Sequence, residues 1–228
     1  MAIRARSQTW SSVLVLIAAA LAWGWGEWQK AYASEKRLPR SEEAQRHSGK
    51  KPERTETYEH YDGCVLVKDR LNDGDSFRLR LPDGREETFR LYFVDTPESA
   101  FKRYGGGESN QQRIQDQADY FDGLSPEDAV ELGKKAKSYV LKLLEAKPVT
   151  VFTRWEDPFG DHRYHVFVQP EDGDSPEWLD ERLVMRGLCR IYTRGADLPD
   201  GTPMARHKDR LRELERGAKR EGAGGWKK

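Results

Sequence analysis

Two short acidic segments hold carboxylates at spacings that suit chemistry on a phosphate. The first is the turn at 72–76, Asn-Asp-Gly-Asp-Ser, and the second runs from Asp95 to Glu98 behind an apolar stretch that contains Arg90. Carboxylate oxygens bind Ca²⁺ or Mg²⁺, a guanidinium binds phosphate, and a further carboxylate can activate water. Either segment alone is also typical of an ordinary turn or a solvated ion pair. Together they favour a site for metal-assisted attack on a phosphodiester.

Strands are needed to position these groups. Residues 89–94 are apolar, with β-branched and aromatic side chains, and the stretch ends where Pro97 removes a backbone donor. It therefore predicts a strand that delivers Asp95 and Glu98 at its end. The acidic turn leads into an alternating strand at 77–81, and the Pro-Asp-Gly turn that follows makes the two strands consecutive and antiparallel.

Helices are predicted in the same domain. Ser125 is a favourable N-cap, followed by proline and two acids in the first helical turn, and apolar positions then face one side as far as Leu144. Strand character returns at 149–155, and a second helix is expected at 178–185, ending at Gly187. Short strands with helices between and after them indicate a small closed barrel.

Both acidic motifs resemble those of the staphylococcal nuclease (thermonuclease-like) family, in which Asp-Gly-Asp-Thr precedes Arg-Leu-x-x-Val-Asp-Thr-Pro-Glu. Here the first reads Asp-Gly-Asp-Ser at 73–76, which keeps the hydroxyl, and the second is intact at 90–98. The resemblance continues in matching order over roughly residues 61–226. It implies an α+β, mainly β fold: a five-stranded OB-fold barrel with about three helices packed outside.

The resemblance also implies roles for single residues. Asp75, Asp95 and the backbone carbonyl of Thr96 match the family's calcium ligands, so Ca²⁺ is the expected cofactor. Glu98 matches the carboxylate that activates the attacking water. Arg90 matches the first catalytic arginine, which binds the phosphate and stabilises the developing charge.

The second arginine of the family is displaced in this chain. It should directly follow an Asp-x-Tyr-Gly turn, but here Asp-Pro-Phe-Gly at 157–160 is followed by Asp161. Arg163 comes just before the next strand, as the family arginine does, so a turn longer by two residues makes it the predicted replacement. The alternative is a surface residue at the tip of a hairpin. His162 and His165 are further candidates, although a lone strand histidine is more often structural.

Two more features bear on substrate choice. Tyr192 lies near the position of the family's nucleotide-pocket tyrosines and is a candidate for base stacking, the alternative being a tyrosine that packs on the barrel. Segment 99–131 is longer than the family's usual connection and includes a polar helical stretch. It is either a lid that alters substrate choice or a helix on the surface.

The N-terminal residues 1–33 predict export. Two arginines are followed by an uncharged apolar stretch at 13–22 and a small-x-small cleavage site, as in a signal peptide. The alternative is an uncleaved transmembrane anchor at 10–28, flanked by tryptophans, with the domain facing outward. Residues 34–60 are polar and almost without large aliphatic side chains, which is typical of a disordered linker.

The remaining residues, 61–228, form the nuclease-like domain, with 99–131 as its insertion. The chain's 39 basic and 39 acidic residues give zero formal charge, which excludes an argument from global attraction to nucleic acid. Cys64 and Cys189 form either a disulfide or two buried free thiols. The sequence predicts a monomeric, Ca²⁺-dependent nuclease that hydrolyses single-stranded or locally open DNA or RNA. The alternative is a catalytically impaired OB-fold nucleic-acid-binding module tethered at the cell envelope.

Overall fold

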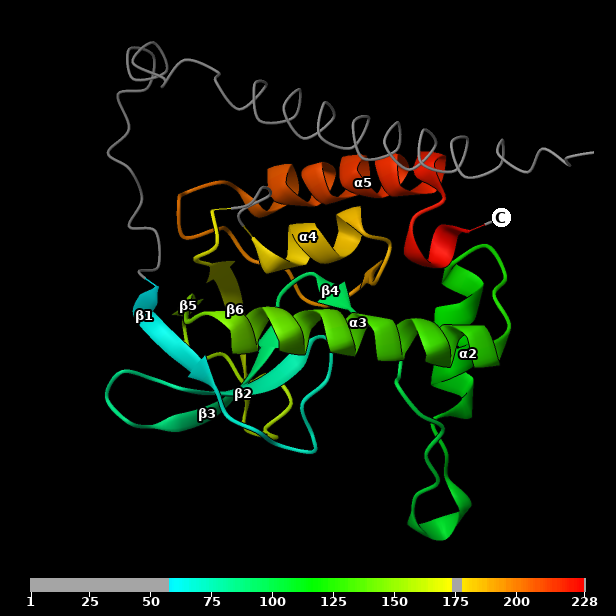
Figure 1. Ribbon diagram of the computed structural model, residues 1–228, viewed down its shortest axis with the longest axis horizontal. Coiled ribbons are helices and arrows are strands. Elements are labelled where there is room, and N and C mark those ends of the chain that lie inside the picture. Colours follow the sequence, from blue (N-terminus) through cyan, green and yellow to red (C-terminus); the bar gives the residue numbers. More distant parts are fainter. Residues whose placement is uncertain (1–57, 174–177, 228) are drawn as a thin grey trace, which may run out of the picture. The chain divides into compact units, whose positions relative to one another are not determined.

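The computed structural model describes residues 58–173 and 178–227 (Figure 1). The expected signal or anchor segment at 1–33 lies outside these residues, as does most of the expected linker at 34–60. Across the described ranges, no helix is both long and apolar enough to cross a membrane. The described residues form the domain that begins with the first strand.

Five strands close into a barrel. In chain order they are β1 (Glu59–Leu66), β2 (Ser76–Arg80), β3 (Glu86–Leu91), β5 (Val149–Thr153) and β6 (Arg163–Pro170). Around the barrel the order is β1-β2-β3-β6-β5, with β3 and β6 parallel and the other pairs antiparallel. The prediction of a five-stranded OB-type barrel is confirmed.

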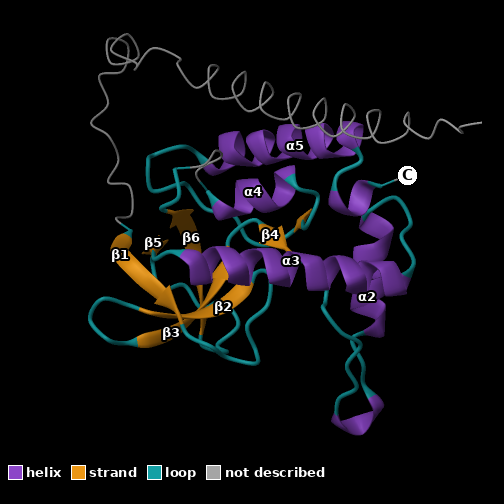
Figure 2. Cartoon of the chain, in the orientation of Figure 1, coloured by secondary structure: helices purple, strands orange, loops and turns teal. Residues whose placement is uncertain are grey.

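Helices pack outside the barrel, and Figure 2 shows α3 running across the strands, with α4 and α5 side by side. The described part of the chain has four α-helices where about three were expected, because the inserted segment adds α2. Ser125 Oγ accepts a hydrogen bond from the Asp128 backbone N–H at 3.1 Å, which confirms the predicted N-cap. The helices are α2 (Gln111–Tyr120), α3 (Pro126–Ala146), α4 (Leu179–Met185) and α5 (Met204–Glu221), with short 3₁₀ turns at Gly105–Gly107 and Gly224–Trp226.

The predicted strand at 89–94 is interrupted at Phe93. After the break, β4 (Val94–Asp95) pairs with β7 (Arg190–Ile191) in a second, two-stranded sheet. Phe93 has a φ of 64°, and its backbone N–H donates to the Arg194 carbonyl at 2.9 Å. The prediction of one continuous strand was wrong because tertiary contacts outweigh the local preference of an aromatic residue for a strand. After the break, the chain leaves the barrel for the second sheet.

Aromatic side chains fill much of the core, among them the buried Phe77, Phe89 and Phe167. Cys64 and Cys189 are also buried, and both are free thiols, so the disulfide alternative is not realised. Burial raises the pKa of the Cys64 thiol to about 12.

Candidate active site

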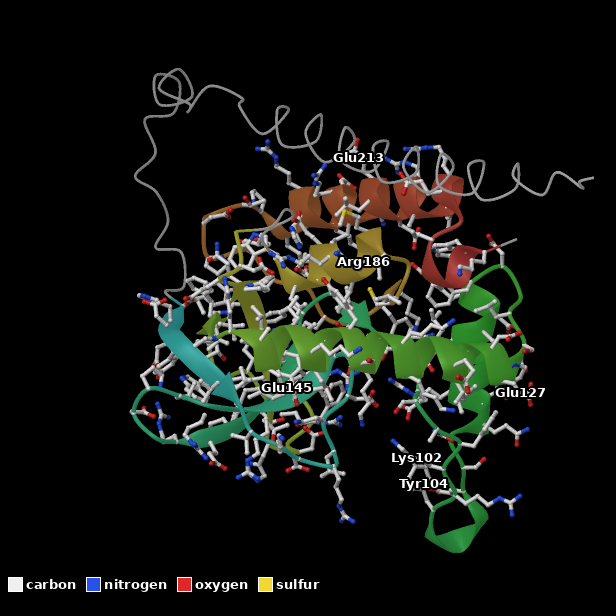
Figure 3. All side chains as sticks on the ribbon, viewed as in Figure 1. Lys102, Tyr104, Glu127, Glu145, Arg186 and Glu213 are labelled. Carbon is white, nitrogen blue, oxygen red and sulfur yellow. The ribbon has the colours of Figure 1, made fainter. Side chains whose placement is uncertain are left out.

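A cleft of about 660 Å³ lies where the acidic turn, β2, β3 and the start of β6 meet the inserted segment. Its lining includes Asp75, Arg90, Glu98 and Arg163, four of the residues that the sequence singles out. The inserted segment lines the cleft as well, through residues that include Lys102 and Tyr104, which Figure 3 labels in the extended stretch before α2. Strands and insertion therefore enclose one site together.

Arg90 occupies the centre of the carboxylate cluster. It lies on β3 opposite Ser76 of β2, so its side chain reaches the residues at the start of β2. Its Nη2 atom is 3.1 Å from Asp95 Oδ1 and 3.5 Å from Asp75 Oδ2. The Arg90 side chain is only 11% exposed, and a guanidinium this deep needs partners of opposite charge.

Asp95 is fully buried, and both of its carboxylate oxygens accept hydrogen bonds. Oδ1 accepts from Nη2 of Arg90 and of Arg113, and Oδ2 accepts from Gln117 Nε2 at 3.0 Å and Arg190 Nε at 2.7 Å. Burial alone would raise the pKa of Asp95, but the charges of Arg113 and Arg190 outweigh it and the pKa is lowered. Asp95 is thus held as a carboxylate by three arginines.

Asp75 is buried beside Asp95. Its Oδ1 accepts from Ser76 Oγ at 3.0 Å, and its Oδ2 accepts from the Thr96 backbone N–H at 3.2 Å. Burial raises the pKa of Asp75 to about 6, because the charge of Arg90 offsets burial only in part and the neighbouring carboxylates add repulsion. The serine that replaces threonine in the first motif therefore supplies a hydrogen bond to this carboxylate.

Glu98 faces the cleft with its side chain 17% exposed. Its Oε1 accepts from Arg113 Nε at 3.0 Å, and its Oε2 accepts from Lys102 Nζ at 3.2 Å and Asn110 Nδ2 at 3.3 Å. Its backbone N–H donates to Gln117 Oε1 at 3.0 Å. All four partners come from the inserted segment, which therefore fixes both the backbone and the carboxylate of Glu98.

Arg163 reaches the same cleft as Arg90, as the sequence predicts. It is the first residue of β6, and the parallel pairing sets it opposite Thr88 and sets His165 opposite Arg90. The two arginines therefore stand on neighbouring strands, two places apart in register. The Arg163 guanidinium pairs with Asp161, the residue found where the family has its arginine.

Tyr192, the predicted stacking residue, is 64% exposed and is not part of the cleft lining. The guanidinium of Arg190 lies 3.8 Å from the centre of its ring, a cation–π contact. Arg190 also pairs with Asp95, so the Arg190 side chain links the Tyr192 ring to the carboxylate cluster. Its role in base stacking stays a prediction.

Five residues that hold Asp95 or Glu98 were not predicted from the sequence: Arg113, Gln117, Arg190, Lys102 and Asn110. The first two are four residues apart on α2 and so share one helix face, a spacing that can be read from the sequence. Which face of a polar helix turns inward is decided by packing, however. Arg190 lies opposite Asp95 in the β4–β7 pair. The two residues are 95 positions apart, so no local sequence pattern predicts this contact.

The expected calcium ligands lie close together, but their oxygens already accept hydrogen bonds. Carboxylate and carbonyl oxygens are the donors that Ca²⁺ prefers. Here both oxygens of Asp95 accept from arginine or glutamine, and the Thr96 carbonyl accepts from Gln117 Nε2 at 3.1 Å. Among residues 58–173 and 178–227, no group of three or more His, Cys, Asp or Glu side chains is placed to share a metal ion. This arrangement does not fit a bound Ca²⁺ ion.

The fold is a closed OB-type barrel, and arginines and carboxylates line a cleft at its side. Residues 88–228 match the family model described as staphylococcal nuclease homologue. This is more than half of the chain, and the chain belongs to that family. The matched range begins within β3 and contains every predicted site residue except Asp75. No curated protein matches the chain.

Proposed function

We propose that the protein is a nuclease that hydrolyses phosphodiester bonds in DNA or RNA, with Glu98 as general base and with Arg90 and Arg163 as phosphate ligands. The observation that supports it is that these three side chains line one cleft. Family membership supports this class of reaction, and the cleft supplies the residues to which we assign it.

In the proposed reaction, Glu98 takes a proton from water, and the resulting hydroxide attacks phosphorus. Glu98 suits this task because its side chain lines the cleft and is 17% exposed, more than the 9% of Asp75, whereas Asp95 is fully buried. Arg90 contacts a non-bridging oxygen and stabilises the charge that develops there. Arg163 stabilises the oxygen that leaves when the phosphorus–oxygen bond breaks, after its guanidinium turns from Asp161 to the phosphate.

We propose single-stranded or locally open nucleic acid as the substrate. The Arg90 side chain is almost nine-tenths buried at the base of the cleft. A scissile phosphate must therefore enter the cleft, and a strand free of its complement can bend to bring it there. The chain's net charge gives no preference between DNA and RNA, because both polymers carry one negative charge per phosphate.

Ca²⁺ dependence, expected from the family resemblance, stays a prediction of the sequence. The steps above use only the chain's own side chains, because the oxygens expected to hold the ion already accept hydrogen bonds. Metal dependence is a separate outcome of the assay described below.

We also propose that the protein is exported and acts as a monomer, either anchored through residues 10–28 or secreted. The proposal of export rests on the apolar segment at 13–22 and its flanking residues. Those residues lie outside the described part of the chain.

A second candidate function is an OB-fold module that binds nucleic acid without cleaving it. The observation in its favour is that Arg163 pairs with Asp161 and that Glu98 is engaged by three side chains. Such a module would retain strand binding while hydrolysis is absent.

Cleavage of single-stranded DNA and RNA by the full-length protein tests both candidates, with Ca²⁺ and with EDTA. Glu98→Gln should reduce the rate by about a hundredfold or more, the usual contribution of a general base. Glu145→Gln is the matched control, because Glu145 is exposed on α3 and lies outside the cleft (Figure 3). Binding without cleavage by the folded wild-type protein would reject the nuclease and favour the binding module.

A further inference from the structure

The inserted helix α2 packs inward. Ile114 and Ala118 are fully buried on it and form a cluster with Ala129 and Val130 of α3. Gln117, on the same helix, is also fully buried. One face of α2 is therefore packed against α3, and the helix is fixed beside the carboxylate cluster.

The amide of Gln117 joins α2 to three residues that follow β3. Its Oε1 accepts from the Glu98 backbone N–H, and its Nε2 donates to Asp95 Oδ2 and to the Thr96 carbonyl, all at 3.0 to 3.1 Å. A buried amide with both ends satisfied fixes the position of a helix. Arg113, one turn earlier on the same face, is thereby held over Asp95 and Glu98.

The guanidinium of Arg113 lies between two carboxylates and remains open to the cleft. Its Nη2 donates to Asp95 Oδ1, and its Nε donates to Glu98 Oε1 at 3.0 Å. These contacts use two of the five N–H groups that a guanidinium has. The side chain is 39% exposed and lines the cleft, so a phosphate can reach its outer edge.

This position gives Arg113 the electrostatic role of a cation. A positive charge next to Asp95 and Glu98 offsets their repulsion toward a phosphate, and the remaining N–H groups form a fork that matches two phosphate oxygens. Asp95 already faces Arg90 and Arg190 as well. A divalent ion at Asp95 would have to displace at least one of these guanidinium groups.

We propose that Arg113, delivered by the inserted helix, binds the scissile phosphate and takes the charge-neutralising role that the family resemblance assigns to Ca²⁺, so that the site works without added metal. This inference rests on the proposed nuclease function. Arg113 is a catalytic residue in this scheme, because it touches the phosphate. It transfers no proton: water attacks phosphorus, Glu98 takes the proton, and Arg113 only donates hydrogen bonds.

Two measurements on the full-length protein test this inference, and the first does not require activity. Calorimetric titration with Ca²⁺ should show no binding by the wild-type protein, because the carboxylates are already paired. Arg113→Ala leaves Asp95 and Glu98 less compensated, so this variant should bind Ca²⁺. Arg103→Ala is the matched control, since Arg103 is an exposed arginine of the same insertion outside the cleft, and it should behave as the wild type does.

The second measurement is strand cleavage in EDTA and in millimolar Ca²⁺. The wild-type rate should be the same in both, and Arg113→Ala should lose about a hundredfold in EDTA, the effect of removing one transition-state donor. Added Ca²⁺ should restore part of that loss. Arg113→Lys keeps the charge without the fork, so its rate in EDTA should lie between those of the wild type and Arg113→Ala. It replaces Arg113→Ala if that variant does not fold.

The two proposals fail in different ways. A wild-type protein that binds Ca²⁺ and is inactive in EDTA overturns the role of Arg113 and leaves the nuclease proposal intact. A wild-type protein that cleaves nothing in either condition rejects the nuclease, while the titration still decides the charge role. Binding of Ca²⁺ by Arg113→Ala alone then supports that role, and binding by both proteins or by neither overturns it.

Discussion

Substitution of Gly133 by alanine tests how closely helix α3 supports the catalytic segment. Gly133 lies in the interior of α3, and a Cβ added there would be 2.4 Å from the Pro97 carbonyl oxygen, 2.5 Å from the Glu98 carbonyl oxygen and 2.7 Å from the Glu98 carbonyl carbon. These atoms belong to the backbone and cannot rotate away. Either α3 or the segment that presents Glu98 must move.

The expected magnitude is a balance of two terms. Overpacking of a well-packed region costs about 1–3 kcal/mol, and contact with backbone atoms favours the upper end of that range. Alanine in a helix interior is better than glycine by about 1 kcal/mol. Gly133→Ala should therefore lower the free energy of unfolding by roughly 2 kcal/mol. It should also lower the cleavage rate by ten- to a hundredfold, roughly the effect of an ångström-scale displacement of a catalytic group.

Gly217→Ala is the control for this experiment. Gly217 lies within α5, and the nearest atom to an added Cβ is the end of the flexible Arg220 side chain, 3.9 Å away. Here only the helix preference remains, so stability should rise by about 0.5–1 kcal/mol. Urea denaturation followed by far-ultraviolet circular dichroism measures both variants. A Gly133→Ala protein as stable as Gly217→Ala would refute the close packing of α3 on the catalytic segment.

Three further outcomes are expected. Arg163→Ala should lower kcat/KM by about a hundredfold. Arg85→Ala is the control, because Arg85 also pairs with an aspartate two residues earlier, and it should leave kcat/KM unchanged. Equal effects of the two substitutions would contradict the role of Arg163. Burial lowers the pKa of His207, but the hydrogen bond and charge of Asp180, 2.6 Å away, outweigh it and raise the pKa. The pair therefore stabilises the fold fully below the ordinary histidine pKa, and this contribution is lost as pH rises through the raised pKa of His207. In denaturant titrations, His207→Gln should lower the free energy of unfolding by about 3 kcal/mol at acidic pH and by less at alkaline pH. Both cysteine thiols should resist a thiol reagent until the protein is unfolded, and rapid reaction of the native protein would contradict their burial.

The sequence predicted those features whose causes are local. The N-cap at Ser125 and the end of α4 near Gly187 follow from the preferences of a few adjacent residues. The meeting of Asp75 with Arg90 follows from an antiparallel pair joined by a short turn. Arg163 could be placed by counting along a strand, which is again a local argument.

The features that escaped prediction depend on contacts between distant segments. The positive φ of Phe93 conflicts with its strand preference, and it is fixed by backbone bonds to a segment about a hundred residues later. The inward face of α2 combines the apolar Ile114 and Ala118 with Gln117, and hydrophobic periodicity gives no reason to bury that amide. Its burial becomes favourable only when Asp95 and the Thr96 carbonyl are present to accept its hydrogen bonds.

The contacts that join α2 to the segment after β3 have a consequence for the orientation of Glu98. Glu98 has its fixed orientation only when α2 is docked, because Gln117 holds its backbone and Arg113 holds its carboxylate. The barrel alone therefore does not complete the proposed site. A single proteolytic cut in the extended stretch at 101–109 would leave α2 packed on α3 through Ile114 and Ala118, so the contacts of Gln117 and Arg113 would then be what joins Glu98 to the helix.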